Sequence, residues 1–124
     1  MKRLYIVGSS SKVAVSIEKL AGSTWETIFY GRTNPHRLSN FIKYPGVQNE
    51  ESVNTLRDLI IKDLKTSRGA EEAGVVILSG ISSNDWRLSY YVNEYMPAII
   101  SDAFAKQTSS MKLVNRSIVL ISSS

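Results

Sequence analysis

The sequence predicts an α/β fold in which a parallel five-stranded sheet is covered by helices on both faces. Two observations lead to this class. Strand-like and helix-like segments alternate along the chain, and the strand-like segments are short, continuous apolar runs. The 124 residues have the length of one ordinary domain, and no linker, repeat or low-complexity segment divides them. We therefore expect one domain over residues 1–124.

The strand-like segments are rich in β-branched and aromatic residues and end at glycine, proline or serine. They are residues 4–7, 25–30, 41–44, 75–78 and 118–121, and we expect the last to be a buried strand. Apolar residues at three- and four-residue spacing predict helices over 13–21, from Glu50 onward, and over 85–106.

The composition excludes several kinds of site. The chain has no cysteine, so disulfides, thiolate metal sites and cysteine nucleophiles are excluded. A lone histidine, His36, excludes a histidine-rich metal site and leaves little room for Ser-His-Asp chemistry. Because no apolar run approaches ~20 residues and no signal peptide is visible, we expect a cytoplasmic protein. The formal charge of +4 suits an anionic ligand.

A polar turn, Gly8-Ser9-Ser10-Ser11-Lys12, joins the first strand to the first helix. Open α/β sheets bind phosphate at such turns, because the following helix offers unpaired N–H donors and a partial positive charge. The serines can instead cap the helix, with Lys12 merely solvated. The turn alone leaves both interpretations open.

Arg32 follows the second strand, 24 residues after Gly8. In dinucleotide-binding folds an acidic residue at this place binds the ribose 2′-hydroxyl, whereas an arginine favours a 2′-phosphate. Arg32, with Arg37 nearby, therefore predicts NADP in preference to NAD. The alternative is an ordinary exposed arginine in a loop.

Pro97 interrupts the long apolar pattern over 85–106. Proline has no N–H, so the carbonyl of Asn93, four residues earlier, loses its helical partner. That carbonyl must bind water or a side chain, and we expect the helix to bend there.

Several segments are similar, in order and spacing, to those of one known family. Residues 7–14 stand where that family has a Thr-Gly-x-x-x-Gly-x-Gly turn, and Gly31-Arg32 matches the Gly-Arg of its NADP-preferring members. Residues 77–82 occupy the place of its Asn-Asn-Ala-Gly segment, and residues 116–123 resemble its fifth strand. The chain thus resembles the short-chain dehydrogenase/reductase family, but only the first half of a usual member.

The resemblance implies a truncated Rossmann-like three-layer fold with strand order 3-2-1-4-5, and NADP as the cofactor. It implies catalytic roles for Ser123 and Asn93, the latter through a backbone carbonyl that holds a relay water. The implied cofactor-binding residues are Gly8, Ser10, Ser11, Lys12, Val13, Arg32, Ser79 and Gly80.

The chain also departs from the family pattern. Lys12 and Ala14 replace two glycines of the turn, and Gly46 lies where the family has an aspartate that contacts adenine. The family's Tyr-x-x-x-Lys pair lies beyond the catalytic serine, and none of the six tyrosines here has a lysine four residues later. That tyrosine is the general acid/base of the family.

Two hypotheses follow. The first is the NAD(P)-binding half of an oxidoreductase, inactive by itself because the Tyr/Lys pair is absent from this chain. The second is a non-catalytic module that acts through self-association or partner binding, because strand 118–121 would lie bare at the sheet edge and promote a dimer. Nucleic-acid binding is disfavoured, since the basic residues are dispersed and the aromatic residues form no stacking platform.

Overall fold

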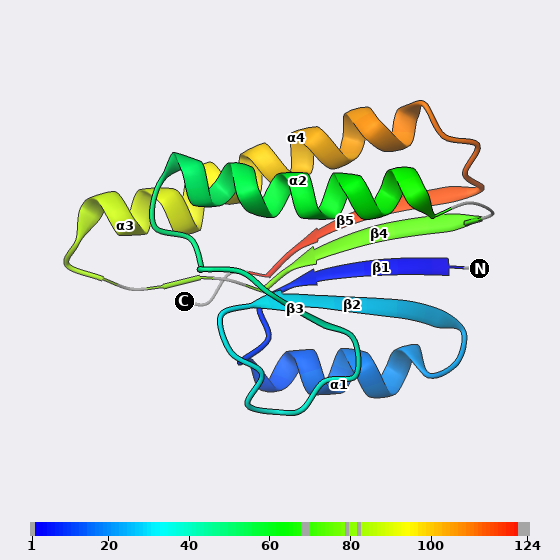
Figure 1. Ribbon diagram of the computed structural model, residues 1–124, viewed down its shortest axis with the longest axis horizontal. Coiled ribbons are helices and arrows are strands. Elements are labelled where there is room, and N and C mark those ends of the chain that lie inside the picture. The colour runs from blue at the N-terminus through cyan, green and yellow to red at the C-terminus, as the bar shows by residue number, and fades with distance from the viewer. Residues whose placement is uncertain (1, 68–69, 79, 82, 122–124) are drawn as a thin grey trace.

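The computed structural model describes residues 2–67, 70–78, 80–81 and 83–121. Its strands are β1 (Lys2–Val7), β2 (Trp25–Gly31), β3 (Phe41–Lys43), β4 (Glu72–Ile77) and β5 (Asn115–Leu120). They form one sheet in the order β3-β2-β1-β4-β5, and every neighbouring pair is parallel (Figure 1). The predicted strand order and direction are confirmed.

Helices cover both faces of this sheet, as predicted. They are α1 (Lys12–Ala21), α2 (Glu50–Thr66), α3 (Trp86–Tyr90), the π-helical turn η1 (Tyr91–Tyr95) and α4 (Met96–Ser109). Helices α2 and α4 lie on one face, and α1 lies on the other (Figure 1). Among the described residues, no helix combines the length and apolar character needed to cross a membrane.

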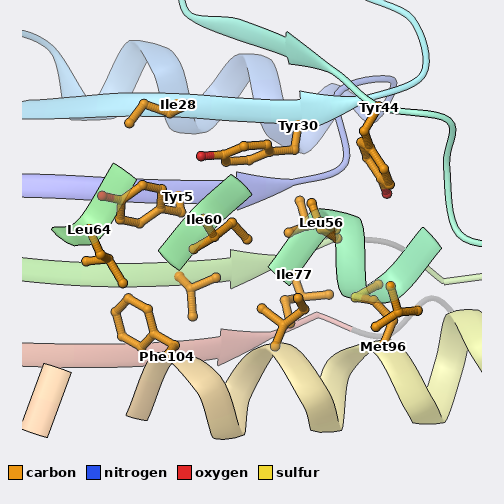
Figure 2. Packing of buried hydrophobic residues seen from close by; sticks show 14 of the residues in the cluster. Tyr5, Ile28, Tyr30, Tyr44, Leu56, Ile60, Leu64, Ile77, Met96 and Phe104 are labelled. Atoms are coloured by element: carbon orange, nitrogen blue, oxygen red, sulfur yellow. The ribbon is translucent and has the colours of Figure 1, made fainter. Parts of the chain in front are cut away.

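Two apolar clusters hold these layers together, because successive side chains of a strand point to opposite faces. The larger cluster packs Tyr5 and Tyr30 of the sheet against Leu56 and Ile60 of α2 and Phe104 of α4 (Figure 2). The smaller cluster lies under α1 and is formed by Ile6, Ala14, Phe29, Leu38 and Val76.

Helix α2 begins at a capping box. The Asn49 side chain accepts from the N–H of Ser52 at 2.9 Å, and the Ser52 hydroxyl oxygen accepts from the N–H of Asn49 at 3.0 Å. Glu50 and Glu51 place negative charge in the first turn, where the helix dipole favours it. The capping box and these two glutamates therefore determine where α2 starts, directly after the loop that follows β3.

The prediction that the last strand is buried was wrong. All six residues of β5 are exposed, with exposed fractions of 41% for Ile118, 44% for Val119 and 58% for Leu120. The strand pairs only with β4 and lies at the sheet edge. A continuous apolar run is typical of a strand covered on both faces, which is why it predicted burial here. The expected strand order had placed residues 118–121 at a bare sheet edge, and that placement is confirmed.

The long predicted helix exists, but it is interrupted near Pro97. Over Tyr91–Tyr95 the backbone widens to a π-helix, in which the N–H of Met96 donates to the carbonyl of Tyr91, five residues back. Pro97 then lies in the first turn of α4, where a missing N–H is tolerated. The expected interruption is thus a wide turn, and the expected bend stays a prediction.

Candidate functional site

A pocket of about 610 Å³ lies at the carboxyl end of the parallel strands. This volume is within the usual range of ligand sites, and this end of an open α/β sheet is where such folds bind ligands. Its described walls are residues 8–11 after β1, 30–33 at the end of β2, 44 and 46–48 after β3, 78, 80 and 81 after β4, and Leu88 and Val92.

Gly8 closes β1 at the floor of the pocket. Its φ of 115° lies in the region that favours glycine, and its N–H donates to the carbonyl of Tyr30 at 2.9 Å. On the other side of β1, the N–H of Leu78 donates to the carbonyl of Val7 at 2.9 Å. The ends of β1, β2 and β4 are therefore held at one level beneath the pocket.

Ser9 connects the turn after β1 to the end of β2. Its side chain is buried, and its hydroxyl donates to the carbonyl of Thr33. A Cβ on Gly31 would lie 1.9 Å from the Ser9 hydroxyl oxygen, so residue 31 must be glycine while Ser9 keeps this position. Ser9 therefore has a structural role in the site.

Helix α1 begins directly after this turn, and Ser11 at its N-cap accepts hydrogen bonds from two of the first N–H groups of the helix. The Ser11 hydroxyl accepts from the N–H of Val13 at 3.1 Å, and the Ser11 carbonyl accepts from the N–H of Ala14 at 3.1 Å. Within the described residues, no acceptor is found for the N–H groups of Ser11 and Lys12. These two groups are the open donors of the helix end.

Arg32 supplies the positive charge of the pocket. It lines the pocket, it is exposed, and it forms no salt bridge with the described part of the chain. The other described lining residues are uncharged. The pocket therefore presents an uncompensated cation beside the helix N-terminus, an arrangement that favours an anionic ligand.

Tyr44 lies at the carboxyl end of the strands (Figure 2), and it lines the same pocket as Arg32. Burial raises the pKa of its phenol to about 12, and the positive charge of Arg32 acts in the opposite direction. Tyr44 therefore stays protonated at neutral pH and keeps a hydroxyl at the wall of the pocket.

The opposite wall is apolar and includes Leu78, Ile81 and Val92. Asn93 stabilises this wall through two hydrogen bonds to the backbone of Ile81. Its Oδ1 accepts from the N–H of Ile81 at 2.9 Å, and its Nδ2 donates to the carbonyl of Ile81 at 2.8 Å. This two-point contact fixes the loop after β4 against η1.

The structure brings together five of the predicted site residues in one pocket: Gly8, Ser10, Ser11, Arg32 and Gly80. Lys12, Val13 and Asn93 do not line it, and Arg37 is in the loop after β2, also outside the lining. Ser79 and Ser123 lie outside the described residues.

Sequence reasoning did not single out Tyr44, Val47, Ile81, Leu88 or Val92 as parts of the pocket. Tyr44 and Val47 could have been found, because they follow a predicted strand and strand ends share one edge of a parallel sheet. The helical spacing of Leu88 and Val92 is equally typical of core residues, so nothing in it pointed to a site.

At the opposite, amino end of the sheet the charged groups are paired with one another. Arg3 donates from Nε to Asp63 Oδ2 at 2.7 Å and from Nη2 to Asp63 Oδ1 at 3.2 Å, and its Nη1 donates to Glu26. The Tyr5 hydroxyl donates to Asp63 Oδ2 at 2.6 Å.

This pairing sets the ionisation of Asp63. Burial acts to raise the pKa of its carboxyl, but the hydrogen bonds from Arg3 and Tyr5 and the charge of Arg3 together hold it below the ordinary value. A second cavity, of about 330 Å³, lies beside this cluster. Among the described residues, no group of three or more His, Asp or Glu side chains is placed to hold a metal ion.

Comparison with known proteins supports the fold. No family model and no curated protein sequence matches the chain. The crystal structure of a short chain dehydrogenase family protein from Francisella tularensis subsp. tularensis SCHU S4 is similar, with a TM-score of 0.65 and 17% sequence identity. The match covers 97% of this chain and 50% of that chain, so the chain spans half the length of its structural neighbour.

This likeness confirms the Rossmann-like fold that the sequence predicted. At 17% identity it concerns the fold alone, and membership of the short-chain dehydrogenase/reductase family stays a prediction.

Proposed function

We propose that the chain binds a nicotinamide dinucleotide in the pocket at the carboxyl end of the sheet, with NADP preferred over NAD. The observation that carries this proposal is that one cavity combines Arg32, which has no ion pair among the described residues, with the open N–H of Ser11 at the start of α1. Dinucleotide phosphates are the anions that such a cavity suits.

The residues present fit the phosphates of this ligand. The N–H of Ser11 would donate to the pyrophosphate, and Arg32 would bind the 2′-phosphate of the ribose. Lys12 replaces a glycine of the family turn, but it does not line the pocket, so its side chain leaves the approach of the phosphates open.

A bound nicotinamide cofactor would supply hydride chemistry, whereas the proton must come from the protein. In the related family a Tyr-x-x-x-Lys pair performs that task, and this chain has no such pair. We therefore propose binding without carbonyl reduction by this chain alone. Steady-state turnover of NADPH with simple ketones or aldehydes by the purified chain would contradict this part of the proposal. The catalytic roles of Asn93 and Ser123 stay predictions.

The binding proposal is tested by titrating the purified chain with NADPH and NADH, followed by cofactor fluorescence. We expect NADPH to bind about ten- to a hundredfold more tightly than NADH, because a charge-assisted contact contributes about 1.5–3 kcal/mol. Arg32→Ala should remove this difference and leave NADH affinity within about twofold.

Arg57→Ala is the matched control, since it removes the same charge from a residue that does not line the pocket and pairs only with exposed Asp58 among the described residues. It should leave both affinities unchanged. Failure of the unmodified chain to bind either cofactor would overturn the proposed function. An equal loss in both arginine variants would contradict the role of Arg32.

A second function, self-association, is favoured by a different observation. Strand β5 leaves one edge without a partner strand in the described structure, and Ile118, Val119 and Leu120 are apolar and exposed there. An unpaired strand edge that carries no charge along these residues is a template for another strand. We propose that β5 of a second copy occupies this edge and extends the sheet.

Light scattering at tens of micromolar, an order-of-magnitude range for weak dimers, tests this proposal. A dimer is expected, and Val119→Lys should convert it to a monomer because a lysine on an edge strand opposes pairing. Leu20→Lys is the matched control, since Leu20 is 87% exposed on α1. A monomeric unmodified chain, or equal effects of the two lysines, would contradict the proposal.

A further inference from the structure

Gly46 lies directly beneath the side chain of Arg32. A Cβ placed on Gly46 would be 2.5 Å from Cδ, 2.7 Å from Cγ and 3.2 Å from Nε of Arg32. The first two distances are shorter than any real contact between these atoms, so the aliphatic stem of Arg32 rests on the bare backbone of the loop after β3. Gly46 is buried there and lines the same pocket as Arg32.

This contact joins two separate segments of the pocket. Arg32 follows β2, whereas Gly46 follows β3, and the hydrogen bond from the N–H of Tyr44 to the carbonyl of Gly31, 3.0 Å long, holds the two segments side by side. Because the position of the stem decides where the guanidinium lies, the absence of a side chain at residue 46 determines which part of the pocket the charge reaches.

The contact with Gly46 is important because little else in the described part of the chain restrains the Arg32 side chain. The guanidinium forms no ion pair within the described residues, so no carboxylate fixes its direction. An exposed arginine has considerable rotamer entropy, and a group that holds its stem reduces the entropy lost on binding an anion. In this pocket the backbone of Gly46 lies against that stem.

We propose that Gly46 is a specificity-determining residue of the nucleotide pocket, which acts by letting Arg32 lie across the loop after β3, where its guanidinium faces a phosphorylated ribose. This inference rests on the proposed function. Any side chain at residue 46 would displace Arg32 and weaken binding of the phosphorylated cofactor more than binding of the unphosphorylated one.

The test compares Gly46→Ala with Gly22→Ala. Both glycines have a positive φ, +88° and +54° respectively, but a Cβ on Gly22 meets nothing within 4 Å. Gly22→Ala therefore controls for backbone strain alone. Gly46→Asn is the second variant of the site, since asparagine tolerates positive φ better than alanine and still carries the Cβ. Thermal unfolding of each variant establishes that it is folded.

We expect Gly46→Ala and Gly46→Asn to lower NADPH affinity about tenfold and NADH affinity by no more than about twofold. Gly22→Ala should leave both affinities unchanged. In a chain that already carries Arg32→Ala, adding Gly46→Ala should have almost no further effect on NADPH, because Gly46 acts through Arg32.

Additive effects of the two substitutions would overturn the inference, as would an equal loss of NADPH and NADH affinity in the Gly46 variants. In either case the proposed function would stand, provided that the unmodified chain binds NADPH. If the unmodified chain binds neither cofactor, the proposed function fails and this inference fails with it.

Discussion

The two ends of the sheet use their arginines in opposite ways. At the amino end Arg3 is held by Asp63 and Glu26, and Asp63 also accepts from Tyr5. At the carboxyl end Arg32 rests on the backbone of Gly46 and forms no ion pair with the described residues. An arginine that is paired with carboxylates of the same chain stabilises the fold, whereas an arginine without such partners can bind an anionic ligand.

The difference follows from which part of a helix meets each end. The last turns of α2 bring the carboxylate of Asp63 over β1 at the amino end. At the carboxyl end the beginning of α1 presents N–H groups, which repel a cation and attract an anion. The connections through α2 and α1 therefore leave a closed cluster at one end of the sheet and an open pocket at the other.

The largest expected effect is at the amino end. Asp63→Ala should lower the free energy of unfolding by about 3 kcal/mol, because it leaves the part-buried Arg3 and the buried Tyr5 without their shared acceptor. Urea unfolding measures this loss. Asp58→Ala is the control, since the salt bridge of this exposed carboxylate with Arg57 is at the surface, and its loss should cost less than about 1 kcal/mol. Equal costs would mean that the cluster contributes little.

A smaller change in the free energy of unfolding is expected when the pH is lowered. The folded-state pKa of Asp63 is lowered, so its ionised form stabilises the fold at and above the ordinary carboxyl pKa of 3.8. This contribution is lost as the pH falls through the lower folded value. Unfolding measured between about pH 5 and pH 2 should therefore show a steeper loss for the unmodified chain than for Asp63→Asn. Parallel curves would show that the folded and unfolded pKa values are the same.

The smallest effect on stability is expected at the carboxyl end. Arg32→Ala should change the free energy of unfolding by less than about 0.5 kcal/mol, because an exposed side chain that has no ion pair among the described residues contributes little to the fold. Urea unfolding in the absence of nucleotide measures this change. A loss comparable to that of Asp63→Ala would show that both arginines are structural, and the contrast between the two ends would disappear.

Much of the fold could be predicted from the sequence, because a parallel sheet buried by helices needs short apolar runs and these are visible directly. The π-helix at Asn93 could not, and the apolar run over 118–121 predicted burial although the expected strand order placed it at the edge. Exposure depends on which neighbours a strand has in space, and the π-helix depends on how the chain around Pro97 settles between α3 and α4.

The positions of Gly8 and Arg32 at the pocket could be predicted, because each follows a strand and the carboxyl ends of parallel strands share one edge of the sheet. The role of a side chain that can serve two purposes could not be predicted. The Ser11 hydroxyl could cap α1 or bind phosphate, and the structure shows the cap. The support of Arg32 by Gly46 joins residues from two loops, and no local pattern in the sequence records such a contact.

The all-parallel pairing has a consequence for how the chain reaches this structure. Each pair of neighbouring strands is separated by a long intervening segment, so no strand can pair with the next through a tight hairpin. Chain-closure entropy must be overcome before any ladder forms, and folding of such topologies is slow compared with helical bundles. Refolding from urea should accordingly be slow, and its yield should fall as the protein concentration rises, because partly folded chains expose apolar surface and unpaired strand edges through which they aggregate.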